Sequence, residues 1–477
     1  MDADLLSPLF LSRLQFAFVI TVHILFPAFT IGLAHWLAFV EWRWLRTKDD
    51  LWRDLYFFWL KIFAVSFGMG VVSGIVMSFQ FGTNWAVLSE KAGNILGPLL
   101  SYEVLTAFFL EAGFLGVMLF GWKKVSDRLH FFATLMVATG TLFSTFWIIA
   151  ANSWMQTPQG HIIDAQGVLQ PADWWAIIFN PSFPYRLAHM VLAAFITTCF
   201  VIGGVSAWYL RRGVHVEAGK RMLKHAVAFA AIAVTLQVFV GDQSGLNVRD
   251  HQPVKLAAIE AHWHAEGEGH SVPLVLIAWP NEREERNDYE IAIPMLGSLI
   301  LTHSLDGQIQ PLTAVPREYR PPVAPVFFAF RVMVGLGMLM LLLSYASLWA
   351  WRRGWLFDPA TRGGRILLNS WRLLAPSGFI ALVAGWYVTE IGRQPFTVYG
   401  VLRTADSVSP NIQAAAVLTS LIIYATVYCF VFGSGIWYLQ KLLRKGPVKQ
   451  PPKDMAGGGK TPARPLSLPD DAIEGGA

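Results

Sequence analysis

The sequence predicts an all-α protein that crosses a membrane about nine times. Of its 477 residues, 54% are hydrophobic and only 14% are charged, whereas about a quarter of the residues of a typical soluble protein are charged. The ranges 63–80 and 412–440 contain no charged residue, and a helix of about 20 apolar residues is long enough to cross a ~30 Å hydrocarbon layer. Together these observations indicate a polytopic membrane protein.

Nine apolar runs define the expected spans. The polar range 242–322, which contains the charged string NEREERNDYE, is expected to form one long loop outside the membrane. The range 446–477 is rich in Pro, Gly and Lys and is expected to be disordered. Six spans therefore lie within 1–241 and three within 323–445. The expected spans are approximately 13–41, 53–80, 97–121, 129–151, 185–210, 222–241, 323–351, 368–390 and 411–440.

The short loops between these runs alternate between basic loops and loops almost free of Lys and Arg. Because basic loops face the cytoplasm, the N-terminus and the 242–322 loop are expected outside and the C-terminus inside. These loops also account for the net charge of +5, so we expect no nucleic-acid partner. Asp2 and Asp4 stand where a signal peptide carries basic residues, and the first span is therefore expected to remain in the protein. The basic loops contain Arg43, Arg46, Lys48, Arg53, Lys123, Lys124, Arg128, Arg211, Arg212, Lys220, Arg221, Lys224, Arg352, Arg353, Arg362 and Arg365.

Ionisable side chains within the spans are candidates for function, because a charged group costs ~2.5–3.5 kcal/mol at the centre of a membrane helix. At 1.5 Å per residue, His23 is expected ~15 Å, Glu103 ~9 Å and Met333 ~15 Å from the outer ends of their spans. His189 and Glu390 are expected close to the outer ends. Glu111 should lie about 12 Å deeper than Glu103 and turned by ~80°, which suits a proton relay better than a shared ligand position. The candidates are His23, His35, Lys61, Glu103, Glu111, His189, Arg331 and Glu390, with Met333 beside Arg331.

Simpler interpretations of these residues stay open at this point. His35 is equally well explained as a hydrogen-bond partner between helices, and Lys61 as a side chain that reaches the inner interface. A methionine such as Met333 usually packs in a core, but Arg331 two residues earlier needs an anion, and a haem propionate would serve. The residues alone are also compatible with a transporter, or with a membrane cytochrome b that passes electrons to another acceptor.

Six short strings give a more specific indication. They are SRLQFAF at 12–18, FQFGTNW at 79–85, GDQSG at 241–245, KLAAIEA at 255–261, FRVMVG at 330–335 and GWYVTEIGRQPF at 385–396. In this order they resemble the family of cytochrome bd oxidase subunit I. The resemblance implies a nine-span subunit of the bacterial inner membrane that oxidises quinol, reduces O2 to water with cytoplasmic protons and pumps none.

The resemblance also implies roles for individual residues. His189 and Met333 would be the axial ligands of a low-spin haem b, which leaves that iron no position for oxygen. His23 and Glu390 would be the ligands of two high-spin haems, one haem b and one haem d or a further haem b, and which residue binds which haem stays open. Glu103 and Glu111 would serve the high-spin site and its proton supply. Arg331, Arg393 and Trp386 would pack around the haems.

Lys255 and Glu260 match the quinol-binding positions of the family, where a carboxylate can accept a proton as the quinol loses electrons. The outer loop is short, as in the cyanide-insensitive branch of the family, so the quinone species and the response to cyanide stay open. The resemblance implies a second large membrane subunit as partner and, in many members, a small single-span subunit. The alternative function is that of a membrane cytochrome b, which would transfer electrons from quinol to an acceptor other than O2.

Overall fold

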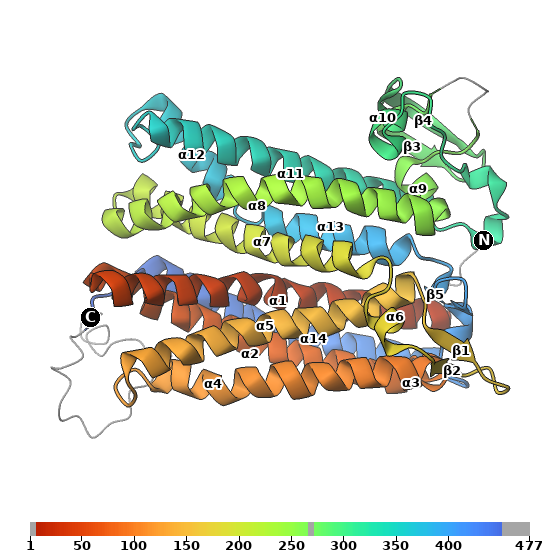
Figure 1. Cartoon of the computed structure of the whole chain (residues 1–477), viewed down its shortest axis with the longest axis horizontal. Helices are drawn as coiled ribbons and strands as arrows, with labels where there is room; N and C mark the ends of the chain where they lie inside the picture. Colours follow the sequence, from red (N-terminus) through yellow and green to blue (C-terminus); the bar gives the residue numbers. More distant parts are fainter. Residues whose placement is uncertain (1–5, 266–270, 451–477) are drawn as a thin grey trace.

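The computed structural model describes residues 6–265 and 271–450, which form an elongated bundle of long helices (Figure 1). Four of the longer helices begin at a side-chain cap, because Ser7, Asp49, Ser126 and Thr361 each accept a hydrogen bond from a backbone N–H of the first turn. The long helices are α1 (Pro8–Thr47), α2 (Asp50–Thr83), α3 (Ala86–Glu103), the π-helix η1 (Val104–Phe108), α4 (Phe109–Phe120), α5 (Asp127–Gln156), α7 (Phe183–Arg212), α8 (Val216–His251), α11 (Val323–Arg352), α12 (Arg362–Leu373), α13 (Ser377–Ile391) and α14 (Ala414–Lys445).

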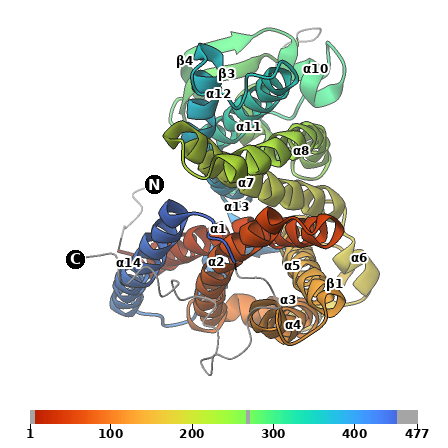
Figure 2. The same cartoon turned by 90° about the vertical axis from the view of Figure 1, so that its left-hand side faces the viewer.

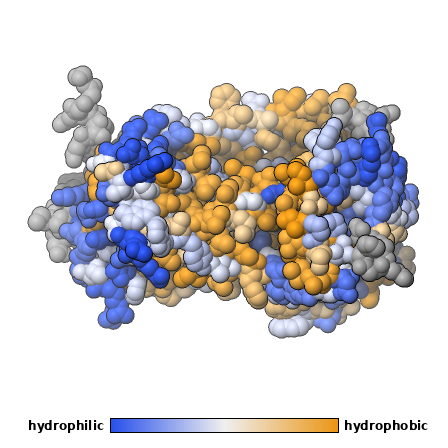
Figure 3. All heavy atoms as spheres, turned by 90° about the horizontal axis from the view of Figure 1, so that it is seen from above, coloured by the Kyte–Doolittle hydropathy of each residue, from blue (hydrophilic) through white to orange (hydrophobic). Residues whose placement is uncertain are grey.

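Eight helices within the described residues are long and apolar enough to cross a membrane, and α12 with α13 would make a ninth if the bent pair crosses as one span. These two helices are bent relative to each other by 43°. Pro376 lies in the break, where its missing N–H and its ring prevent a continuous helix. Figure 3 shows a broad hydrophobic band between two hydrophilic ends. The predicted all-α membrane fold is confirmed, with its eighth span bent.

Two predicted span boundaries differ from the ends of the helices. The third span begins at Ala86 rather than near residue 97, and α8 continues past residue 241 to His251. Hydropathy detects only the apolar part of a helix, and polar residues can extend it where their side chains reach water. The string GDQSG, at the predicted loop boundary, is therefore helical.

The two ends of the bundle differ in composition. The start of α1 lies at one end, called here the outer end, together with three small hairpins and several short helices (Figure 1). The basic loops and the last described residues lie at the opposite, inner end (Figure 1). The outer-end elements are β1 (His161–Ile163), β2 (Leu169–Pro171), α6 (Trp174–Ile178), α9 (Pro253–Glu260), β3 (Leu274–Asn281), β4 (Arg286–Ile293), α10 (Leu296–Thr302), η2 (Leu312–Ala314), η3 (Arg317–Tyr319), β5 (Phe396–Val398), β6 (Leu402–Arg403) and η4 (Ala405–Ser407).

Helix α1 occupies the centre of the bundle, in contact with α2, α5, α7, α13 and α14 (Figure 2). A glycine permits the close approach of α1 and α7, since a Cβ on Gly32 would lie 2.3 Å from Thr198 Oγ1. Large side chains such as Trp59, Trp154 and Trp371 are fully buried around these helices. The core therefore fixes the long helices against one another and positions the side chains that they carry.

The chain continues past α14 along the inner end. The backbone N–H of Gln450 donates a 2.9 Å hydrogen bond to Asp54 Oδ1, and Arg53 Nη2 donates a 2.7 Å bond to the Gln450 carbonyl. These bonds hold the first residues of the predicted tail against α2. The remainder of the tail, 451–477, lies outside the described residues, so the prediction of disorder there stays a prediction.

Candidate functional site

His23 lies in the outer half of α1 and faces α2. Its Nδ1 is 2.9 Å from Ser73 Oγ, and Ser73 is itself completely buried. A hydrogen bond at Nδ1 fixes the orientation of an imidazole and leaves Nε2 as the ligand atom. Gly74 lies beside the ring, since a Cβ there would be 3.1 Å from His23 Cε1. The arrangement suits a histidine that holds a metal through Nε2.

His189 and Met333 lie in the outer halves of α7 and α11. His189 makes no hydrogen bond to the described residues, although its Nδ1 is fully buried. It faces α8, where a Cβ on Gly241 would lie 3.5 Å from its Cε1. Met333 faces α13, where a Cβ on Gly385 would lie 2.9 Å from its Sδ. Both candidate ligands thus face a glycine on the neighbouring helix.

Trp386 lies close to the sequence neighbours of His23 and His189. It packs against a buried cluster that contains Ile24 and Met190, the sequence neighbours of His23 and His189. It also follows Gly385, which faces Met333. The structure therefore gathers three predicted ligands and Trp386 into one region of the outer half.

These residues fit haem groups. A buried histidine without a protein partner and a methionine thioether are donors that haem iron accepts. Three glycines beside His23, His189 and Met333 remove side chains where a flat macrocycle must approach closely. Within 6–265 and 271–450, no three His, Cys, Asp or Glu residues form a group suited to a free metal ion.

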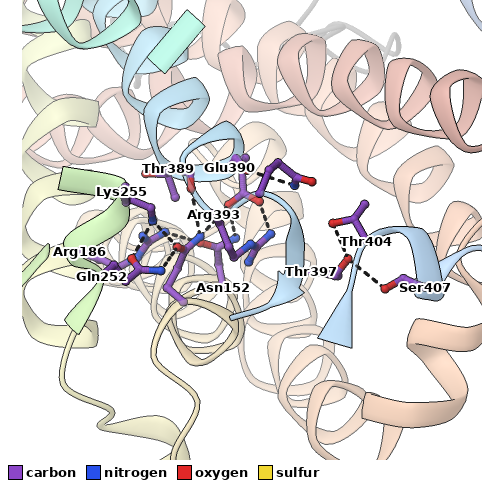
Figure 4. A network of polar contacts seen from close by, with 12 residues as sticks. Asn152, Arg186, Gln252, Lys255, Thr389, Glu390, Arg393, Thr397, Thr404 and Ser407 are labelled. Carbon is purple, nitrogen blue, oxygen red and sulfur yellow. Dashed lines mark hydrogen bonds and ion pairs between the residues drawn. The ribbon is translucent and has the colours of Figure 1, made fainter. Parts of the chain in front are cut away.

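Glu390 lies at the outer end of α13 in a network of polar side chains (Figure 4). Arg393 Nη2 forms an ion pair with Glu390 Oε2, while Asn152 Nδ2 donates a 3.0 Å hydrogen bond to Oε1. Arg186 Nη2 in turn donates to Asn152 Oδ1. Two nitrogens of Arg393, Nε and Nη1, are buried without partners among the described residues. Unpaired guanidinium donors beside the candidate ligands suit the carboxylate groups of a haem.

Lys255 joins this network from the outer loop. Its Nζ donates hydrogen bonds to Gln252 Oε1 (2.7 Å) and Gln156 Oε1 (2.5 Å), and Gln156 Nε2 donates a 3.4 Å bond to Glu390 Oε1 (Figure 4). Burial, followed by the charges of Arg186 and Arg393, lowers the pKa of Lys255 well below its ordinary range. One glutamine thus links a predicted quinol-binding residue to a predicted haem ligand.

Glu260 and Arg331 form the second polar contact of the outer loop. Arg331 Nη2 donates to Glu260 Oε2 (2.9 Å) and to the Val275 carbonyl (2.7 Å), and the guanidinium lies 3.8 Å from the centre of the Phe327 ring. The sequence interpretation that Arg331 requires a haem propionate is therefore not needed, because the carboxylate of Glu260 balances its charge. Glu260 is itself buried.

Glu103 and Glu111 both face α5, which corrects their expected separation by ~80° around a regular helix. Ser144 Oγ donates a 2.8 Å hydrogen bond to Glu103 Oε1, and a Cβ on Gly140, one turn away, would lie 2.6 Å from Glu111 Cγ. The π-helix η1 lies between the glutamates. A π-helix takes more residues per turn than an α-helix, so the second side chain rotates back toward the first.

The depth of Glu103 also differs from the sequence expectation. It lies midway between Ala86 and Phe120 rather than in the outer half, because α3 begins earlier than predicted. His35 is no bridge between helices through a hydrogen bond, since its Nδ1 bonds the carbonyl of Ile31 on its own helix (2.8 Å). Neither residue contacts the Glu390 network.

The sequence interpretation missed Asn152, Gln156, Arg186 and Gln252. The three amides carry no charge and lie outside the predicted spans, so a search for charged groups within spans does not find them. Arg186 did give a signal, because it is a charge inside the predicted span 185–210. It lies next to the end of that span, and its hydrogen bond to Asn152 places it in the network.

Fold and site together define a polytopic membrane cytochrome. The profile of the family described as cytochrome bd terminal oxidase subunit I matches residues 11–447. The chain belongs to this family, and the predicted oxidoreductase class, with dioxygen as acceptor, is confirmed with it.

Relatives and a solved structure match over most of the chain. Cytochrome bd ubiquinol oxidase subunit 1 of Bacillus subtilis (strain 168) is 34% identical, covering 92% of this chain and 94% of its own. Cytochrome bd-II ubiquinol oxidase subunit 1 of Escherichia coli (strain K12) is 32% identical, with 92% and 96% covered. The bd oxidase structure from Geobacillus thermodenitrificans has a TM-score of 0.84 and 28% identity, with 92% and 99% covered.

Replacing Gly385 by alanine should disturb Met333 selectively. Alanine normally stabilises a helix by about 1 kcal/mol relative to glycine, but the new Cβ would approach Met333 Sδ to 2.9 Å, and overpacking costs ~1–3 kcal/mol. We expect a weakened or shifted low-spin haem spectrum. Gly337→Ala, where a Cβ meets nothing within 4 Å, is the control. Equal spectra for both variants would contradict the assigned contact.

Proposed function

We propose that this chain is the haem-bearing subunit of a quinol:dioxygen oxidoreductase that takes electrons from quinol at the outer end. Family membership and the two curated relatives, both named ubiquinol oxidases, support this enzyme class. The observation that carries the proposal is the hydrogen-bonded link from Lys255 through Gln156 to Glu390. It joins the residues proposed for quinol to those proposed for haem within one end of the bundle.

We assign the ligands as the resemblance implies. His189 and Met333 would hold a low-spin haem b, and His23 and Glu390 would each hold a high-spin haem, one of type b and one of type d or b. Bound haems supply one-electron transfer, and an iron with an open axial position binds O2. The buried, unpaired ring of His189 and the three facing glycines support these positions.

Glu260 is proposed as the acceptor of a quinol proton. It is buried, and Arg331 donates to its Oε2; Oε1 is proposed to accept a proton from a bound hydroxyl. Lys255 would contact the other side of the quinol, as the resemblance implies; it is buried and donates to Gln252 and Gln156 beside the Glu390 network. Protons lost from the quinol would leave at the outer end, where α9 meets the loop.

Protons for O2 reduction are proposed to come from the inner, cytoplasmic side through Glu111 and then Glu103. The two carboxylates face the same side of α5, with Gly140 and Ser144 beside them. Electrons and protons would then meet from opposite sides of the membrane and build a proton gradient without pumping.

Glu111→Gln tests this route. An amide keeps the shape of the side chain but cannot carry a proton, so we expect oxygen consumption to fall by ~100-fold, in the range of lost acid–base groups. The absorbance of all haems should stay unchanged. Glu90→Gln, an exposed change on the neighbouring helix α3, should have no effect. Wild-type turnover of Glu111→Gln would remove this residue from the route.

The enzyme is proposed to reside in the bacterial cytoplasmic membrane with a second large membrane subunit and, as in many relatives by resemblance, a small single-span subunit. Large exposed apolar side chains along α2, η1 and α14, such as Phe79, Leu105 and Phe430, support contact with lipid or membrane subunits.

Optical spectra of the purified complex test the whole proposal. Reduced-minus-oxidised spectra should contain one low-spin and two high-spin haem components, and pyridine haemochromes should give their types. Quinol-dependent oxygen consumption should accompany them. A colourless complex, or one with six-coordinate haem alone, would refute the proposal.

A further inference from the structure

A cavity of about 530 Å³ opens at the inner end of the bundle, between the ends of α7, α12 and α14. This volume is within the range of small-molecule sites. Val205 and Trp208 of α7, Ala375 after α12, and Leu443 of α14 contribute to its wall. Beside it, Tyr209 Oη donates a 2.7 Å hydrogen bond to the Leu443 carbonyl, which ties α7 to α14. The cavity is therefore a gap beside this hydrogen bond between α7 and α14, while α12 packs on α7 through the stacked rings of Trp371 and Phe200.

Each of the three helices contributes an arginine to the cavity, namely Arg212, Arg372 and Arg444. None of them forms an ion pair with a carboxylate of the described residues. The guanidinium of Arg212 lies 5.0 Å from the centre of the Trp208 ring, and Arg372 donates only a 3.4 Å hydrogen bond to Asn369. Three converging guanidinium groups call for an anion with several oxygens, and a phosphate matches their planar donors.

The surroundings of the cavity distinguish a lipid phosphate from a free one. The sides of α12, α13 and α14 carry exposed apolar side chains: Leu373, which follows Arg372 in the chain, is 78% exposed, Ile380 49% and Trp437 63%. These helices belong to proposed membrane spans, so hydrocarbon chains would cover the apolar sides. A phospholipid satisfies both features at once, since its phosphate lies at the membrane surface and its acyl chains lie below.

We propose that the cavity binds the headgroup of an anionic phospholipid from the leaflet at the inner end. Arg212, Arg372 and Arg444 contact the phosphate oxygens, and the acyl chains lie along α12, α13 and α14. Basic pockets between membrane helices on the cytoplasmic side are suited to such lipids. The lipid would join the end of α7 to the end of α14 at a place where side chains leave a gap.

The test uses the complete complex in nanodiscs of phosphatidylcholine that contain a photoactivatable phosphatidylglycerol. Wild type should cross-link to peptides of α7, α12 and α14. The triple variant R212Q/R372Q/R444Q should need on the order of 100-fold more phosphatidylglycerol for equal labelling, because each basic residue at the membrane surface contributes about fivefold. Unchanged haem spectra in the variant would establish that it is assembled.

The control variant is R352Q/R353Q/R362Q, which removes three exposed arginines from the same end of the molecule but outside the cavity. It should label like wild type. Equal loss of labelling in both variants would show that general surface charge, not the cavity, attracts the lipid. Equal labelling by a phosphatidylcholine probe would show that the cavity does not select anionic lipids. Displacement by millimolar inorganic phosphate would make this a free-phosphate site. Cross-links from another subunit or from residues 451–477, in place of lipid, would also overturn the proposal.

Discussion

Glu260→Gln is expected to abolish quinol oxidation while all haems remain bound. The amide preserves the size of the side chain and still offers an oxygen to Arg331, but it cannot accept a proton. Loss of a general base reduces rates by ~10²–10⁴-fold. We expect a fall of this size in quinol-dependent oxygen consumption, with unchanged reduced-minus-oxidised spectra after chemical reduction by dithionite.

Glu285→Gln is a matched control for the ion pair. Glu285 lies in the same outer loop, where Arg317 Nε and Arg320 Nη1 donate hydrogen bonds of 2.7 and 2.8 Å to its Oε1. Bonds from Arg320 and Arg317 lower the pKa of Glu285, so it stays ionised at neutral pH and accepts no proton there. Its replacement should leave quinol oxidation near the wild-type rate. Normal turnover of Glu260→Gln would point to another base, and loss of haem would indicate a structural role.

The sequence predicted the membrane fold because the bilayer imposes a simple requirement. Each span needs about 20 apolar residues, and this requirement was visible in every one of the nine runs. The ends of the helices were predicted less accurately than the spans, since α8 remains helical through the polar GDQSG string and Pro376 divides the eighth span. Apolarity reports contact with lipid, whereas helix ends depend on capping and on neighbouring loops.

The candidate site was predictable where an ionisable side chain lies within an apolar run. His23, His189 and Glu390 are of this kind. The partner of Arg331 was not predictable, because Glu260 lies 71 positions earlier and reaches it only when the outer loop folds back. The shared direction of Glu103 and Glu111 depends on the π-helix η1, for which their spacing gave no signal.

Met333→Leu is expected to remove the low-spin haem signal and leave the high-spin signals in place. Leucine has similar volume, and such an exchange usually costs less than ~1.5 kcal/mol of folding stability, so the helices should assemble normally. What leucine lacks is the sulfur that would fill the sixth position of the low-spin iron. Quinol-dependent turnover should therefore collapse, while carbon monoxide should still bind to the reduced high-spin site.

Met338→Leu on the same helix separates loss of a ligand from a general effect of methionine replacement. Met338 is 44% exposed at the side of α11, so leucine there should leave both spectrum and turnover unchanged. Since Gly385 brings α13 against Met333, Met333→Leu and Gly385→Ala should both affect the low-spin component, the first by removing the donor atom and the second by displacing it. An unchanged low-spin spectrum in Met333→Leu would show that the iron has a different axial ligand.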